Sequence, residues 1–132
     1  MTHVSKQILQ DKVSEKLLGQ FAKFFAEQDE FKVRDLFSNL LSKSEQIMLV
    51  KRLAIVIMVL EKHPTSSIAR TVLVSDSTVR DIKSKMSLGH FDFLIKRYEN
   101  KTFDGKAFLS LLETLLNAGM PSLGKDRWKS LR

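Results

Sequence analysis

The chain contains no cysteine among its 132 residues. This absence excludes disulfide frameworks, thiolate metal sites and cysteine catalysis, and it agrees with a reducing compartment, so we expect a cytoplasmic protein. The longest unbroken apolar run, from Leu53 to Leu60, is also far shorter than the ~20 residues needed to span a bilayer. The N-terminus carries no apolar signal segment. We therefore expect a soluble protein with no membrane partner.

Glycine and proline are scarce as well, with five and two residues respectively. Such a composition favours helices, and no pattern of alternating residues typical of strands is found. The 43% of hydrophobic residues can form one core at this length. The sequence therefore predicts an all-α protein.

Enzyme signatures are missing too. The sequence has no glycine-rich phosphate loop and no nucleophile motif, so we expect no enzyme and no cofactor. The three histidines, His3, His63 and His90, are too scattered to form a helical metal pair. We expect no metal site.

Positive charge is what the sequence has in excess. The 22 Lys and Arg against 15 Asp and Glu give +7 and a pI near 9.8, above the value of about 9 at which nucleic acid becomes a serious candidate partner. The excess is concentrated in residues 62–101 (+4) and 120–132 (+3). Charge alone leaves the choice of partner open.

Apolar residues recur at helical spacing along most of the chain. Ser42 with Glu45 forms a capping box at the start of one helix, whose second half is apolar almost all round, and Pro64 is expected to end that helix. The expected helices are 4–25, 31–41, 43–63, two within 65–86, 90–98 and 104–118.

The first two expected helices carry wide apolar stripes. Their phenylalanines are interpreted as core or as a dimer seam: Phe21, Phe24, Phe25, Phe31 and Phe37. A single chain of this length has too little surface to cover both stripes, so we expect a homodimer.

Residues 65–85 read as two helices that cross through a tight turn. Such a pair needs a small residue at the crossing, for which Ala69 is suited, and Ser75 is a plausible N-cap of the second helix. Apolar residues around the crossing complete the pattern: Ile68, Val72, Val74, Val79 and Ile82. The pattern indicates a helix-turn-helix over about 65–86.

The second helix of this motif leaves a polar outer face: Ser77, Thr78, Arg80, Asp81, Ser84 and Lys85. Placed in a major groove of DNA, the N-terminal part of this helix would bring hydroxyls and Arg80 to base edges. Lys83 and Lys85 would then lie toward the phosphate backbone of the DNA. The turn lacks the usual glycine, so either Leu73 is left-handed or the turn is wider than standard.

Residues 40–86 resemble the Trp repressor superfamily, and within it the Trp repressor-like bacterial regulators. The matching features are Leu40-Leu41-Ser42 with Glu45, the step Lys51-Arg52-Leu53, and Ser-Ile-Ala followed by Val-Ser-Asp-Ser-Thr-Val. The resemblance implies an intertwined helical dimer that binds operator DNA. Its domain would cover residues 1–100, leaving 101–132 as a C-terminal helix and basic tail.

Residue by residue, the resemblance makes Ser66 and Ser67 phosphate contacts and assigns five residues to the groove: Ser75, Ser77, Thr78, Arg80 and Asp81. Arg52 matches an arginine that holds the tryptophan corepressor in that family. The second such arginine falls at Asp81, so no tryptophan corepressor is expected.

The sequence thus favours a DNA-binding transcriptional regulator, with repression as its expected mode and double-stranded DNA as its partner. Two alternatives remain open: a helical interaction or oligomerisation module with a vestigial helix-turn-helix, and a sequence-indifferent nucleic-acid binder. Trp128, in the basic tail, either packs on the domain or stacks on nucleic acid.

Overall fold

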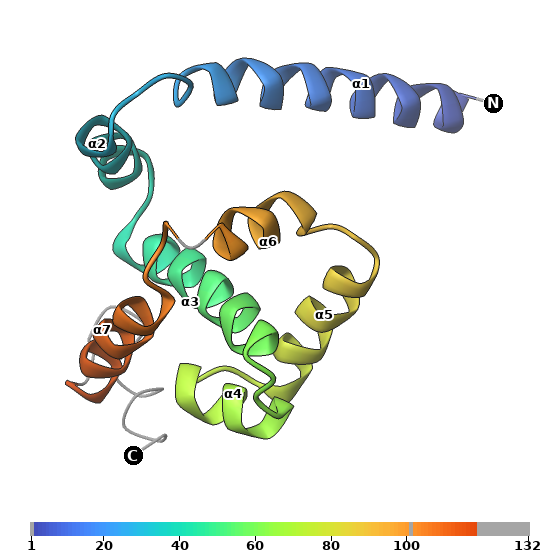
Figure 1. The fold of residues 1–132 in the computed structure, drawn as a ribbon. Coiled ribbons are helices and arrows are strands. Elements are labelled where there is room, and N and C mark those ends of the chain that lie inside the picture. Colours follow the sequence, from blue (N-terminus) through green and yellow to red (C-terminus); the bar gives the residue numbers. More distant parts are fainter. Residues whose placement is uncertain (1, 101, 119–132) are drawn as a thin grey trace. The chain divides into compact units, whose positions relative to one another are not determined.

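The structure is a computed structural model that describes residues 2–100 and 102–118 (Figure 1). Every regular element in these ranges is a helix, which confirms the all-α prediction. In chain order the helices are α1 (Thr2–Lys23), α2 (Glu30–Leu40), α3 (Lys43–Leu60), α4 (Thr65–Val72), α5 (Asp76–Ser87), α6 (Asp92–Glu99) and α7 (Gly105–Asn117).

The chain divides into two compact units between Ser42 and Lys43. In the first unit, α1 ends at Lys23 and a turn leads to Asp29, whose carboxylate accepts a hydrogen bond from the Lys32 amide at 2.9 Å and caps α2. Phe25 lies between Phe21 and Phe37, with ring centroids 5.1 and 5.3 Å away. These three rings connect the end of α1 to α2.

This first unit has almost no interior. All side chains of α1 from residue 6 onward are exposed, and α2 has no buried residue. Among the phenylalanines expected in a core or a dimer seam, Phe24 and Phe31 are 68% and 70% exposed. The apolar stripes are therefore real but uncovered in a single copy, and the core interpretation of these two residues is wrong.

The second unit is built on α3, which packs against α4, α5 and α7 (Figure 1). Residues 54–58 in its second half are buried, as expected for the central helix of a core. The other helices contribute one apolar stripe each to this core, through Ile68, Val72, Val79, Ile82, Leu112 and Leu116.

Helix α3 ends at Leu60, earlier than the expected stop at Pro64. Lys62 takes a left-handed conformation (φ 66°), and the amide of His63 donates to the Met58 carbonyl at 3.0 Å, which closes the last turn. Pro64 instead occupies the N-cap of α4. The proline therefore starts the next helix rather than ending this one.

Tyr98 of α6 connects three elements of the second unit. Its hydroxyl donates to the Glu61 carboxylate just after α3. Its ring lies against Gly105, where a Cβ atom would be 2.7 Å from Tyr98 Cε1. Since only glycine leaves this space, Gly105 is required where α7 begins, next to its N-cap Asp104.

None of the helices within residues 2–100 and 102–118 combines the length and apolarity needed to cross a membrane.

We expect Glu61→Gln to lower the pKa of Tyr98. The hydrogen bond to Glu61, together with burial and the charges of Glu61 and Asp104, raises this pKa above 10.0. The fold therefore favours the neutral phenol, and the resulting stability is present below pH 10 and lost as pH rises through the raised pKa. Tyr98 is the only tyrosine, so phenolate absorbance reports it alone.

Glu99→Gln is the matched control, because it removes a neighbouring carboxylate that contributes nothing to this shift. An absorbance midpoint that stays unchanged in the Glu61→Gln variant would contradict this account of how α6 is held.

Candidate nucleic-acid interface

Helices α4 and α5 cross through a three-residue turn, Leu73 to Ser75. Ala69 is buried where the helices pack, as its small size suggested. Ile68 and Val72 on α4, and Val79 and Ile82 on α5, are buried around it, while Val74 is half-buried. The inner side of the pair therefore agrees with the sequence pattern.

The turn itself depends on a left-handed Leu73, with φ 61° and ψ 56°. The amides of Leu73 and Val74 both bond back to the Ala69 carbonyl, so the turn closes in the manner that glycine usually permits. A non-glycine residue in this conformation costs about 1–2 kcal/mol. The structure thus takes the left-handed alternative, and the wider turn is excluded.

Lys51 is the residue that sequence reasoning missed. It is only 2% exposed, and its ammonium donates to the Leu73 carbonyl at 3.2 Å. Its position on α3 contained a signal, because Ile47 lies four residues before it and Ile55 four residues after it, both buried. A lysine on the buried stripe of a helix needs a polar partner inside the fold.

Ser75 caps α5 as expected. Its hydroxyl accepts from the Thr78 amide at 3.1 Å and lies 2.9 Å from the Thr78 hydroxyl. Both hydroxyls therefore have a partner within the protein, and Thr78 is half-buried rather than fully exposed. Ser75 and Thr78 therefore stabilise the first turn of α5, and they also lie at the margin of its outer face.

The remaining outer face of α5 is open. Ser77, Arg80 and Ser84 are exposed. Asp81 and Lys85 are exposed too, but they pair with each other at 3.2 Å, one helical turn apart. Arg80 is thus the cation of α5 that projects to solvent without an ion pair to its own helix.

The start of α4 gathers several residues expected to contact phosphate. Ser66 is exposed and Ser67 is half-buried, and Pro64 provides no side-chain cap for the first amides of this helix. Lys83 reaches across from α5 and donates to the Thr65 hydroxyl at 2.6 Å. The structure thereby places the Lys83 cation beside the N-terminus of α4.

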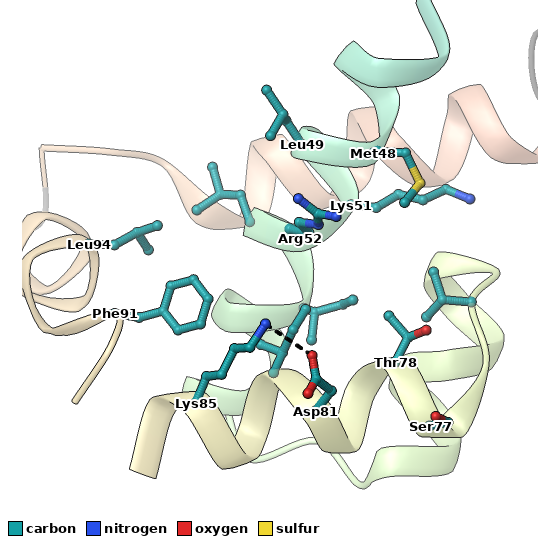
Figure 2. A pocket seen from close by; sticks show the side chains of 14 residues that line it. Met48, Leu49, Lys51, Arg52, Ser77, Thr78, Asp81, Lys85, Phe91 and Leu94 are labelled. Carbon is teal, nitrogen blue, oxygen red and sulfur yellow. Dashed lines mark ion pairs between the residues drawn. The ribbon is translucent and has the colours of Figure 1, made fainter. Parts of the chain in front are cut away.

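An open pocket of about 750 Å³ lies between α3, α5 and the start of α6. Figure 2 shows Arg52 on α3, the pair formed by Asp81 and Lys85 on α5, and Phe91 and Leu94 at the end of the pocket near α6. The structure therefore brings Arg52 and Asp81 to one pocket. Besides Arg52, two lysines line this pocket, Lys51 and Lys85, and Asp81 is the one carboxylate among the described residues that line it.

The other candidates are separate from this region. His63 and His90 are exposed, and among the described residues no three His, Cys, Asp or Glu side chains gather in a way that could hold a metal ion. Trp128 and the rest of the basic tail lie outside the described residues.

Comparisons with known proteins add no relative. No family model, no curated protein and no solved structure matches this chain.

We expect Ala69→Leu to destabilise the protein by about 1–3 kcal/mol, because the added methylenes have to enter the packed crossing of α4 and α5. Arg70→Leu places the same side chain one residue later, at an exposed position, and should change stability by no more than about 0.5 kcal/mol. Chemical denaturation of both variants measures the difference. Equal losses of stability in the two variants would contradict the close packing of α4 against α5 at Ala69.

Proposed function

We propose that this protein is a sequence-specific DNA-binding transcriptional regulator in which α4 and α5 act as a helix-turn-helix. One observation supports this most strongly. The inner face of α5 is fixed in the core by Val79 and Ile82, while its outer face offers Ser77, Arg80 and Asp81 to solvent. A short helix held so firmly on one side and so polar on the other is suited to a major groove.

In this arrangement the first turns of α5 approach base edges. Arg80 can form a bidentate contact with guanine, and Asp81 can accept a bond from the amino group of cytosine. Ser77 lies beside Arg80 and Asp81 on these first turns. The hydroxyls of Ser75 and Thr78 lie there too, and although they bond to each other they can form further hydrogen bonds. The short side chains let the helix backbone come close to the bases.

Phosphate contacts come from both helices of the pair. The first amides of α4, with Ser66 and Ser67, form an N-terminus suited to an anion, and the Lys83 ammonium is held beside it through Thr65. Lys85 lies further along α5. Residues 62–101 carry a net charge of +4, so the positive charge coincides with this motif.

A homodimer completes the proposal. Apolar side chains of α1, with Phe24 just beyond its end, leave an apolar face exposed, which water disfavours and a second copy can cover: Ile8, Leu9, Val13, Leu17, Leu18, Phe21 and Phe24. Two copies would present two α5 helices to half-sites about 34 Å apart. A lone motif reads too few base pairs for specificity.

The same apolar face favours a second candidate, a helical interaction module whose α4–α5 pair binds no nucleic acid. A third possibility is binding to any nucleic acid through charge alone. Selection of bound fragments from random duplex DNA separates the three. The proposal expects an enriched motif and a preference for it that persists at ~150–200 mM salt. Affinity that collapses with salt indicates charge alone, and no binding indicates the interaction module.

Sedimentation at micromolar concentration should show a dimer, with or without DNA. Leu17→Glu is expected to shift the protein to monomer, because it places a carboxylate within the apolar face of α1. Lys16→Gln, at an exposed position of the same helix, also lowers the net charge by one unit and is the matched control for charge. A wild-type protein that sediments as a monomer would contradict the proposed dimer.

Arg80→Ala should reduce discrimination between the selected duplex and a scrambled one by about 5- to 150-fold, the worth of one bidentate base contact. Lys85→Gln should instead weaken binding to both duplexes alike and lower the salt slope by about 0.9. Lys96→Gln, at an exposed lysine of α6, is the control for charge.

Titrations of each variant at several salt concentrations provide these values. If Arg80→Ala lost equal affinity for both duplexes, or if Lys85→Gln changed the preference between them, α5 would not lie in the groove as proposed.

Free L-tryptophan should neither bind nor change DNA affinity. Asp81 lies on the same pocket as Arg52 and is paired with Lys85, so a carboxylate stands where the second stacking guanidinium would be and only one guanidinium plane remains. Calorimetry that detects a micromolar tryptophan site would contradict this.

A further inference from the structure

Lys51 is a charged residue inside the core of the second unit. At 2% exposure its ammonium is removed from bulk water, although its neighbour Arg52 is exposed. Burial of an ammonium costs desolvation free energy that only polar partners within the fold can offset, so an apolar residue would fit this position at lower cost. A specific task for the ammonium group explains its presence better.

One partner of this ammonium indicates the task. Lys51 Nζ donates to the carbonyl oxygen of Leu73, the residue in the left-handed conformation between α4 and α5. Backbone carbonyls at the C-terminal end of a helix carry partial negative charge, which a cation stabilises. The contact fixes the orientation of the peptide group between Leu73 and Val74.

That peptide group determines where α5 begins. Only Val74 separates Leu73 from Ser75, the N-cap whose hydroxyl bonds to the Thr78 amide. A change in the Leu73 carbonyl direction therefore changes the direction in which α5 leaves the turn. Since Arg80 lies one turn into that helix, its position follows from the same peptide group.

We propose that Lys51 is a positioning residue for DNA recognition: its buried ammonium holds Leu73 in the left-handed conformation and thereby sets the direction of α5. The effect on DNA rests on the proposed function. Lys51 itself touches no base or phosphate in this scheme and acts through the turn.

Hydrogen exchange tests the contact without DNA. The Val74 amide is bonded to the Ala69 carbonyl at 3.0 Å and reports closure of the turn. Lys51→Met should raise its exchange rate by about tenfold relative to amides within α3. Lys96→Met makes the same chemical change at an exposed lysine and should leave the rate unchanged. Equal rates in wild type and Lys51→Met would overturn the proposal.

Rescue by glycine separates positioning from general support of the core. Glycine adopts the left-handed conformation without steric cost, so Leu73→Gly should make the turn less dependent on Lys51. Lys51→Met is expected to lower affinity for the selected duplex by about tenfold in the wild-type background and by less than about threefold in the Leu73→Gly background. Equal losses in both backgrounds would show that Lys51 does not act through Leu73.

The two proposals fail in different ways. If the wild-type protein binds no duplex, the proposed function fails, while the exchange of the Val74 amide still tests Lys51. If Lys51→Met does not fold on its own, circular dichroism should show that the double variant with Leu73→Gly does. A double variant that is also unfolded overturns the positioning role.

Discussion

A charged group inside an apolar core has to find polar partners there, and for Lys51 one of these partners is the backbone of a strained turn. The Lys51 ammonium lies 3.2 Å from the Leu73 carbonyl, in a core made by α3, α4, α5 and α7. The turn needs a left-handed residue where leucine stands. Because the turn connects α4 to α5, this contact links the central helix to the helix that the proposed function places in the groove.

Much of the second unit could be predicted from sequence because local signals and burial agree there. The apolar half of α3, the small Ala69 and the Ser75 cap each follow from one physical rule applied to a few neighbouring residues. The order of the helices follows in the same way. For the turn, the sequence leaves two alternatives, a left-handed Leu73 or a wider turn, since a tight turn without glycine has few other conformations.

The remaining features depend on contacts distant in sequence. Lys51 and Leu73 are 22 residues apart and Lys83 and Thr65 are 18 apart, and no local pattern pairs them. Helix α3 ends at Leu60 because Lys62 takes a left-handed conformation, whereas the sequence predicts the end of this helix at Pro64. The core alternative for Phe24 and Phe31 is wrong because a single copy provides no surface against them, while the dimer seam stays a prediction.

The central claim is that the outer face of α5 reads DNA. The most direct measurement is a titration of ¹⁵N-labelled protein with the selected duplex, followed by amide chemical shifts. The account predicts that the largest changes fall on the start of α4 and the first turns of α5, around Ser66, Ser77 and Arg80, with smaller changes on α7. Changes concentrated on α1 or α7, with α5 unaffected, would contradict it.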